Sequence, residues 1–298
     1  MKKILIQLDT DEHPSTFDAI VAHDAGVDAL LRYGGITTEV VKGLVQSAFF
    51  TRGPKDLATL AVWVGGSSVG DGEEVLAEVQ KAFFGPFRVS AMLDSNGCNT
   101  TAATTVARLA REIDLKGRQA VVVGAGAVGL RAAALLVREG CDITVSGIPA
   151  DRFGEGKYRR ARGLSVAEER DLRIVEPADD DELAKVLDGA SLVLAAGPAG
   201  IELLPESIWT GIDSIEVLAD FNAAEPLGIE GTEASDDLAE HHGKRVLGAL
   251  AIGGPKMKVH KACVRRLFET NDAILDVDGV YEIAQELGSK ELGAKEGD

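Results

Sequence analysis

Residues 118–147 read RQAVVVGAGAVGLRAAALLVREGCDITVSG. The run at 120–123 is apolar and mostly β-branched, which predicts a buried parallel strand. Three glycines with the spacing G-x-G-x-x-G follow it, and an Ala- and Leu-rich helical pattern then extends to Glu139. Residues 142–145 predict a second strand. A strand, a glycine turn, a helix and a strand within about thirty residues form the βαβ unit that binds dinucleotides.

Each glycine of this motif has a mechanical role. Gly124 allows the tight turn, Gly126 lets the backbone approach a pyrophosphate, and Gly129 lets the helix pack against the strand. The first helical turn, with Ala127 and Val128, offers N–H groups and the positive end of the helix dipole to the phosphates. A glycine-rich turn without a ligand is the alternative, but its place between a strand and a helix favours a dinucleotide site.

The composition limits the class of protein. The chain has 298 residues, enough for two domains, of which 45% are hydrophobic and 27% charged. Its net charge of −17 argues against nucleic acid and anionic membranes as partners. The three cysteines form no C-x-x-C pair, so buried thiols are expected. We find neither a signal-peptide core nor a run of roughly eighteen apolar residues, and we expect a cytoplasmic protein with no membrane partner.

The residues before the glycine motif predict an α/β domain of their own. Strands are expected at 4–8, 28–33, 57–64 and 87–93, with helices opened by Pro14 and at 37–49 and 73–84. After a bridging helix at 99–113, the nucleotide domain continues with strands at 172–175, 191–196, 215–219 and 245–250 and helices at 179–187 and 205–209. Gly253, Gly254 and Pro255 predict the start of a helix at 256–269, and 273–287 predict a final helix.

We therefore predict an α/β fold with two parallel-sheet domains, the second a Rossmann-type nucleotide domain. The first domain comprises residues 1–98 and the C-terminal helix at about 271–288, and it holds the substrate. Residues 99–270 form the bridging helix and the nucleotide domain, and a deep cleft is expected between the two domains.

The second strand of the motif bears on the choice of nucleotide. NAD sites carry an acid at the end of this strand, but here it ends in Ser146 and Gly147, and Asp142 lies at its other end. Basic residues follow at 152–162, which favours a 2′-phosphate clamp with Arg152 as its best candidate. We expect NADP as the cofactor, with NAD left open, and a solvated basic loop is the alternative. Ser146 is itself a cofactor-binding candidate, and three more follow other strands of this domain: Ala196, Gly197 and Asp220.

Several stretches resemble one family over nearly the whole chain. They are QLDTD (7–11), PSTFD (14–18), FFGPFRVS (83–90), MLDSNGCNTTAA (92–103), GIELLP (200–205), ADFNA (219–223), PLGI (226–229) and GALAIGGPKMKVHKAC (248–263). The chain thereby resembles the bacterial NAD(P)-dependent methylene-tetrahydromethanopterin dehydrogenases of formaldehyde oxidation.

The resemblance implies reversible oxidation of methylene- to methenyl-tetrahydromethanopterin, with hydride passing to the nicotinamide. It also implies a pterin domain that closes on the nucleotide domain, and a homotrimer. One departure concerns the second strand, where NADP-specific members have an Arg directly after the glycine and this chain has Ile148. The related tetrahydrofolate enzymes carry a Tyr-x-x-x-Lys motif for cyclohydrolase chemistry, which no tyrosine here begins, so we expect no second, hydrolytic activity.

The chemistry selects candidate site residues at strand ends. Loss of hydride from a CH₂ between two nitrogens leaves a cation that nearby carboxylates stabilise, and it needs no metal. The catalytic candidates are Lys256, Asp18 and Asp94, and the substrate-binding candidates are Asp9, Asp11, Asn96, Thr101, Asn222, Lys258 and His260. Ordinary helix capping explains the acids of the first loop equally well. No histidine shows metal-ligand spacing.

The cations at the expected helix start need separate comment. Lys256 and Lys258 would oppose the helix dipole at an N-terminus, which favours an anionic ligand or a site carboxylate beside them. Lys256 and His260 share a helix face, so they could act together. Solvated lysines are the alternative.

Three other functions stay open at this point. The first is the same reaction on tetrahydrofolate. The second is a shikimate- or glutamate-type dehydrogenase, although the lysines in the body of the first domain lie outside strand-end turns, unlike the catalytic Lys of those enzymes. The third is a non-catalytic NAD(P)-sensing protein, which would leave the polar strand ends unexplained.

Overall fold

The computed structural model describes residues 1–149, 166 and 169–295, and the chain divides into two compact units. Unit 1 comprises Met1–Thr100 and Met257–Asp298, and unit 2 comprises Thr101–Lys256. Both boundaries fall inside helices, α4 (Cys98–Glu112) and α10 (Ala249–Arg266). The second half of α10 therefore belongs to unit 1, whereas we assigned it to the nucleotide domain.

Unit 1 contains a parallel sheet whose described strands follow the order β12-β4-β3-β1-β2. The strands are β1 (Ile4–Asp9), β2 (Ala29–Tyr33), β3 (Leu60–Gly65), β4 (Ser90–Leu93) and β12 (Ile274–Leu275). The helices are α1 (Thr16–Asp24), α2 (Thr38–Phe49), α3 (Val69–Lys81) and α11 (Val277–Lys295), with 3₁₀ turns at Pro54–Thr59 and Ser95–Gly97.

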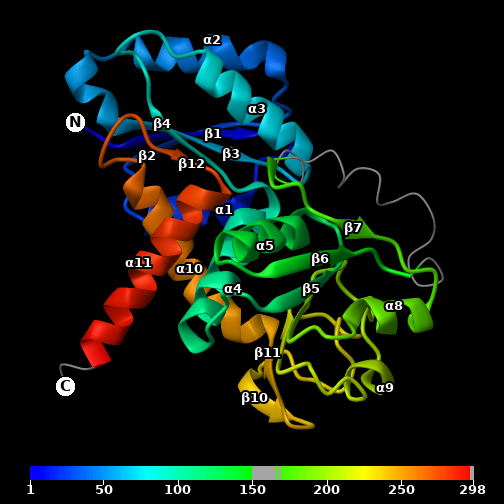
Figure 1. The fold of residues 1–298 in the computed structure, drawn as a ribbon. Helices are drawn as coiled ribbons and strands as arrows, with labels where there is room; N and C mark the ends of the chain where they lie inside the picture. The colour runs from blue at the N-terminus through cyan, green and yellow to red at the C-terminus, as the bar shows by residue number, and fades with distance from the viewer. Residues whose placement is uncertain (150–165, 167–168, 296–298) are drawn as a thin grey trace. The chain divides into compact units, whose positions relative to one another are not determined.

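Successive side chains along the strands of unit 1 point to opposite faces of the sheet, and the two faces pack against different helices, which gives two layers. Ile6 and Leu8 of β1 join a core that includes Val45 of α2 and Val75 of α3. These two helices cover one face of the sheet (Figure 1). The other face carries buried Trp63, which contacts α10. Each fully buried aliphatic side chain contributes about 1.5–3 kcal/mol, so the first layer holds the unit together.

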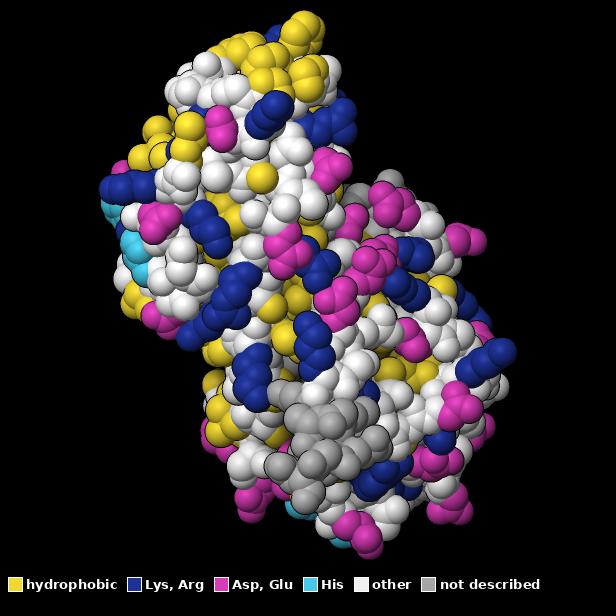
Figure 2. Space-filling model, turned by 90° about the vertical axis from the view of Figure 1, so that its left-hand side faces the viewer, with side chains coloured by type: hydrophobic (Ala, Val, Ile, Leu, Met, Phe, Trp, Pro, Cys, Tyr) yellow, Lys and Arg dark blue, Asp and Glu magenta, His cyan; other side chains and the backbone are white. Residues whose placement is uncertain are grey.

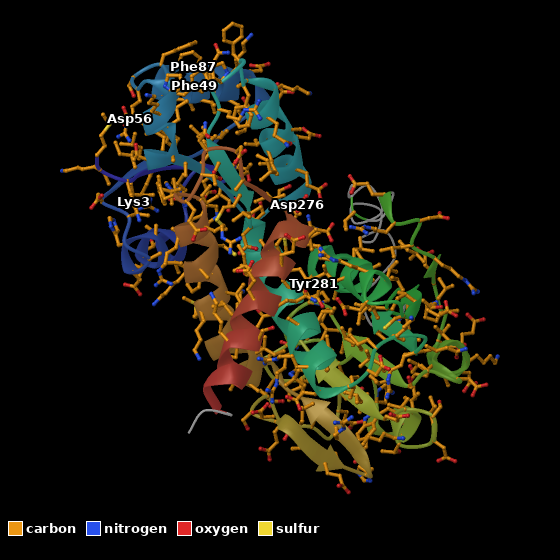
Figure 3. All side chains as sticks on the ribbon, turned by 60° about the vertical axis from the view of Figure 1, so that its left-hand side comes forward. Lys3, Phe49, Asp56, Phe87, Asp276 and Tyr281 are labelled. Carbon is orange, nitrogen blue, oxygen red and sulfur yellow. The ribbon has the colours of Figure 1, made fainter. Side chains whose placement is uncertain are left out.

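An aromatic cluster closes one end of this first layer. The rings of Phe49 and Phe87 lie 5.9 Å apart between centroids, and the ring of Phe50 contacts both (Figure 3). Phe50 and Phe84 are 58% and 65% exposed. Hydrophobic side chains accordingly gather at this end of unit 1 in the space-filling view (Figure 2).

Unit 2 contains a second sheet whose described strands follow the order β10-β11-β9-β8-β5-β6-β7. The strands are β5 (Gln119–Val123), β6 (Asp142–Ser146), β7 (Ile174–Val175), β8 (Leu192–Ala195), β9 (Val217–Asp220), β10 (Asp237–His241) and β11 (Lys244–Leu247). The described pairs are parallel except β10 with β11, which forms a hairpin. The helices α5 (Ala127–Arg138), α8 (Asp180–Leu187) and α9 (Glu206–Trp209) cover the sheet, with α8 and α9 packed over one apolar face. This is the predicted Rossmann-type arrangement.

Several predicted boundaries were wrong for local reasons. The strand expected at 57–64 begins at Leu60, because Pro54 starts a 3₁₀ turn before it. The helix expected at 73–84 begins at Val69, since Ser68 caps it through its hydroxyl. The strands β10 and β12 were not predicted, because β10 has the mostly polar sequence DLAEH and β12 has only two residues.

The largest boundary error concerns α10. This helix begins at Ala249, so Gly253, Gly254 and Pro255 lie inside it. The N–H of Leu250 donates to the carbonyl of Ala234 over 2.8 Å, so one N–H of the first turn has an acceptor outside the helix before the glycines are reached. Pro255 is tolerated although it removes one helical hydrogen bond.

Two further sequence expectations can be compared with the described residues. Cys98, Cys141 and Cys263 are free and buried, as expected. In this part of the chain we find no helix that combines the length and the apolar character needed to cross a membrane.

Candidate functional site

The glycine turn of unit 2 has the geometry that its spacing predicts. Gly124 has a φ of +112°, and a Cβ there would lie 2.5 Å from the carbonyl oxygen of Ala196. A Cβ on Gly129 would overlap the carbonyl oxygen of Gly124. Gly126, the N-cap of α5, differs because the nearest atom to a Cβ there is 3.9 Å away. Packing therefore requires two glycines, and the third leaves open backbone at the start of α5.

The side chains at the end of β6 are buried within unit 2. Ser146 is fully buried, and its hydroxyl donates to the carbonyl of Gly147 over 2.8 Å. Ile148 is 5% exposed, and its Cδ1 lies 3.1 Å from the Cβ position of Gly197. Arg152, the predicted clamp, lies outside the described residues.

The ends of β8 and β9 hold a loop. The carboxylate of Asp220 accepts from the N–H of Asn222 over 2.8 Å and from that of Ile229 over 2.9 Å. Burial raises the pKa of Asp220 to about 6, and these backbone hydrogen bonds oppose the rise. The amide of Asn222 donates to the carbonyl of Pro226 and accepts from the N–H of Ala224. Both side chains thus fix the loop that borders the turn after β8.

In unit 1, the first strand-end acids cap their own loop. Asp9 is fully buried and accepts from the N–H groups of Asp11 and Ser15 over 3.0 and 2.9 Å. Asp11 accepts from the N–H and the hydroxyl of Ser67, which joins the loops after β1 and β3. The carboxylate of Asp18 lies near that of Asp9. A Cβ built on Gly65 would be 3.2 Å from Oδ2 of Asp18 and 3.3 Å from Oδ2 of Asp9. Two carboxylates therefore meet over a glycine.

Asp94 lies in a buried polar centre at the end of β4. Its carboxylate accepts from the N–H groups of Asn99 and Thr100 and from the Thr100 hydroxyl, over 2.7–3.0 Å. Nε2 of His260 lies 3.4 Å from Oδ2 of Asp94, and the His260 ring is 4.8 Å from that of Trp63 between centroids. Asp94 and His260 are each 1% exposed. Asp94 thus caps α4, and this pair connects β4 to α10 within unit 1.

The remaining candidates differ in exposure. Asn96 is exposed in a left-handed conformation with a φ of 52°, and Lys258 is exposed on α10. Thr101 and Lys256 are half-buried. Because α10 begins at Ala249, neither lysine lies at a helix N-terminus, and the argument from the helix dipole was wrong.

A polar network beneath the first loop was missed. Arg32 donates from Nε to Oε1 of Gln7 over 3.0 Å and from Nη2 to the carbonyl of Ser15, while Gln7 donates to Asp9 over 3.3 Å. The sequence did contain one sign of this network, because Gln7 is a polar residue within an apolar run of β1. The network fixes the loop that carries Asp11 and Ser15.

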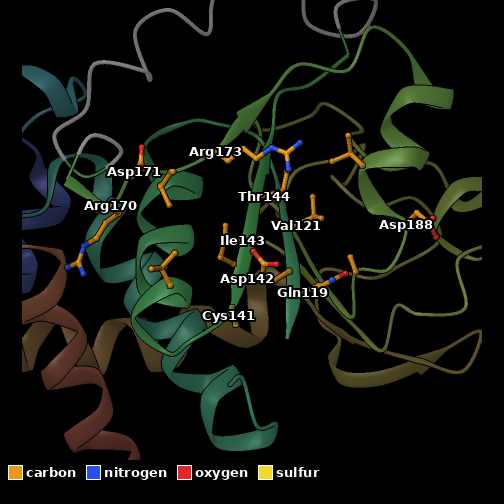
Figure 4. Close-up of a pocket in the computed structure, with 15 residues that line it drawn as sticks. Gln119, Val121, Cys141, Asp142, Ile143, Thr144, Arg170, Asp171, Arg173 and Asp188 are labelled. Carbon is orange, nitrogen blue, oxygen red and sulfur yellow. The ribbon is translucent and has the colours of Figure 1, made fainter. Parts of the chain in front are cut away.

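A pocket of about 490 Å³ lies in unit 2 at the other edge of the sheet (Figure 4). It is lined by the first residues of β5 and β6, among them Gln119 and Asp142, and by the segment from Arg170 to Arg173. The glycine turn lies at the carboxyl ends of the same strands, so this pocket does not serve it. Within the described residues, no group of three or more His, Cys, Asp or Glu side chains could hold a metal ion.

Comparison with known proteins assigns each region. Residues 16–96 match the family model described as methylene-tetrahydromethanopterin dehydrogenase, N-terminal, and residues 112–204 match one described as putative NAD(P)-binding. A shikimate 5-dehydrogenase of Listeria monocytogenes, solved with shikimate and NAD, is 13% identical with a TM-score of 0.53. The similarity extends over 95% of this chain and 96% of the shikimate dehydrogenase chain. At 13% identity it supports the fold alone.

Two proteins of Methylorubrum extorquens resemble the chain over nearly its full length. The NAD(P)-dependent methylenetetrahydromethanopterin dehydrogenase is 29% identical, and the alignment covers 96% of this chain and 99% of that enzyme. The bifunctional protein MdtA is 43% identical over the same shares. On this identity and coverage, together with the matching N-terminal model, the chain belongs to the family of bacterial NAD(P)-dependent methylene-tetrahydromethanopterin dehydrogenases.

Proposed function

We propose that the chain transfers hydride reversibly from methylene-tetrahydromethanopterin to NAD(P)⁺ and so produces the methenyl form. One observation carries the proposal. The methylene-tetrahydromethanopterin dehydrogenase model matches residues 16–96, inside unit 1, and the NAD(P)-binding model matches residues 112–204, inside unit 2. A pterin-binding and a nucleotide-binding unit are the two parts that this reaction needs.

The residues present fit a dinucleotide. The open position at Gly126 leaves the backbone accessible, and the first N–H groups of α5, at Ala127, Val128 and Gly129, have no partner within the helix itself. These groups would hold the pyrophosphate. When bound, the nicotinamide accepts the hydride, and the turn at Ala196–Gly197 would border it.

On the substrate side, the protein must hold two flat rings within about 3–3.5 Å of each other and exclude water. We propose that Asp18 stabilises the cation that forms as hydride leaves, because its carboxylate stands at a strand end beside Gly65. Lys256, Asn96, Lys258 and Thr101 are the further residues that we propose for contacts to polar groups of the pterin.

The other predicted site residues take a supporting part in this proposal. Asp9, Asp94 and His260 hold the loop after β1 and the start of α4, and Asn222 holds the loop after β9. Their carboxylates and rings keep the exposed candidates in place.

Cofactor preference, assembly and location are part of the proposal as well. We propose that NADP and NAD both serve as acceptors, that the protein forms a homotrimer as the family resemblance implies, and that it acts in the cytoplasm. Its net charge of −17 supports a small-molecule partner over nucleic acid.

The decisive assay offers the protein methylene-tetrahydromethanopterin or methylene-tetrahydrofolate with NADP or NAD and follows absorbance at about 340 nm. Turnover on the methanopterin form is expected. Turnover on the folate form alone would reassign the substrate, and nucleotide binding without turnover on either would make the protein a sensor.

A matched pair of variants tests the proposed role of Asp18. Asp18→Asn should lower kcat roughly 10- to 100-fold, because the cation loses its carboxylate. Asp24→Asn changes an exposed carboxylate of the same helix, paired with Lys261 over 2.8 Å, and should leave kcat unchanged. Equal effects of the two variants would remove Asp18 from the mechanism.

A further inference from the structure

The carboxyl ends of β6 and β7 lie side by side in unit 2. Ser146 is paired with Val175, so Gly147 and Glu176 are the next residues of their strands. The N–H of Gly147 donates to the carbonyl of Val175 over 2.7 Å. A Cβ on Gly147 would lie 3.4 Å from Cγ of Glu176. The exposed side chain of Glu176 therefore begins beside the glycine that follows β6.

This place has a defined role in dinucleotide sites. An acid at the end of the second strand accepts hydrogen bonds from the ribose hydroxyls of the adenosine. In this chain the residues that end that strand do not supply one. The hydroxyl of Ser146 donates to its neighbour's carbonyl, and Ile148 is buried against Gly197. Glycine at position 147 has no side chain and supplies no acid either.

We propose that Glu176 supplies the missing carboxylate from the neighbouring strand and thereby sets the selectivity between NAD and NADP. Its carboxylate accepts from the ribose hydroxyls of NAD, and it repels the 2′-phosphate of NADP. The inference rests on the proposed function, because it requires a dinucleotide on the glycine turn. It goes beyond that function by naming a residue that the second strand itself does not contain.

Electrostatics explain why one carboxylate matters here. A charge-assisted hydrogen bond contributes about 1.5–3 kcal/mol, which corresponds to roughly 10- to 100-fold in affinity. A 2′-phosphate carries up to two negative charges at neutral pH, so the same carboxylate that favours NAD disfavours NADP. Both effects change the ratio of the two affinities in the same direction.

The test measures binding without the pterin. NADH and NADPH are titrated separately into the full-length protein, and the rise in nucleotide fluorescence gives each Kd. The glutamate variant Glu176→Gln keeps the shape of the side chain and removes its charge. It should shift the ratio of the two Kd values at least roughly 10-fold toward NADPH. The probes 5′-AMP and 2′,5′-ADP, which carry the adenosine end alone, should show the same shift.

Two further variants complete the experiment. Glu240→Gln makes the same change at an exposed position on β10, the opposite edge of the sheet, and should leave the ratio unchanged. Adding Gly147→Asp to Glu176→Gln returns a carboxylate to the end of β6, and the ratio should move back toward NADH.

The possible outcomes separate this inference from the function on which it rests. Wild-type protein that binds neither nucleotide would overturn the proposed function and the inference together. Nucleotide binding with the same Kd ratio in Glu176→Gln and wild type would overturn the inference alone.

Discussion

Replacement of Asp220 by Asn should change the pH dependence of stability in unit 2. Asp220 is 1% exposed, and each of its two carboxylate oxygens accepts a backbone N–H, from Asn222 and Ile229. The amide of the variant has one acceptor oxygen, so one N–H loses its partner at every pH, at a cost of about 1–3 kcal/mol. The charge adds a second effect that depends on pH.

The magnitude of that second effect follows from the two pKa values. Burial raises the pKa of Asp220 from 3.8 to about 6 in the folded chain. The folded state therefore binds the proton more tightly, and this stabilisation is full below pH 3.8 and lost as the pH rises through 6. Between about pH 7.5 and about pH 5 the wild-type protein gains about 1.4 kcal/mol in free energy of unfolding from this group. The Asn variant gains nothing from it.

One tryptophan in each unit makes the measurement specific. Trp209 is fully buried in unit 2, and Trp63 is fully buried in unit 1. In a Trp63→Phe background, urea unfolding followed by fluorescence reports on unit 2. The destabilisation caused by Asp220→Asn should be about 1.4 kcal/mol larger at pH 5 than at pH 7.5.

A control at the same loop separates titration from hydrogen bonding. Asn222→Ala removes the side-chain bonds of that loop but no titratable group. Its destabilisation should be equal at the two pH values. If the effect of Asp220→Asn is equal at both as well, the raised pKa and the reasoning from burial are refuted.

Four further substitutions have definite expected outcomes. Gly129→Ala should destabilise unit 2 by about 2 kcal/mol or more, because its Cβ would overlap the Gly124 carbonyl, whereas Gly126→Ala should keep full stability and weaken NAD(P)H binding. Asp94→Asn should cost unit 1 about 1–3 kcal/mol, read from the tryptophan of that unit, and an unchanged transition would contradict its capping role. Lys244→Met should cost unit 2 a similar amount, since the buried ammonium donates to the carbonyls of Ile212 and Ile215; equal urea midpoints would show that these bonds contribute nothing.

The parts of the fold that the sequence predicted are those with strong periodicity. The βαβ unit at 118–147 appears as β5, α5 and β6 with boundaries within one residue of those expected. Its apolar strand and its helix repeat over enough residues to define a pattern. The strand β12, with two residues, is held by pairing to β4 and carries no pattern of its own.

The start of α10 shows how a local signal misleads. Gly253, Gly254 and Pro255 are typical of a helix start, and we interpreted them in that way. The helix begins earlier because Leu250 finds its acceptor at Ala234, sixteen residues back along the chain. Such a long-range bond cannot be recognised from the order of residues, so the cations at Lys256 and Lys258 were placed wrongly.

The acids at strand ends show a different limit. The sequence placed Asp9, Asp11 and Asp94 at the carboxyl ends of strands, and each does lie at such an end. The sequence could not say which bonds they make. The carboxylates of Asp9 and Asp94 accept hydrogen bonds from backbone N–H groups of their own loops. Gly65, which has no side chain, lets the carboxylate of Asp18 approach that of Asp9.

The glycine turn offers the clearest division between packing and function. Gly124 needs its positive φ and the close approach to Ala196, and Gly129 needs contact with Gly124, so the fold alone accounts for both. Gly126 has a φ of −83°, which any residue adopts, and open space at its Cβ position. Packing within unit 2 gives no reason for glycine there. Since α5 begins at this point and no side chain caps it, the reason lies in what binds over the turn, and an anionic pyrophosphate is the ligand that such a helix start favours.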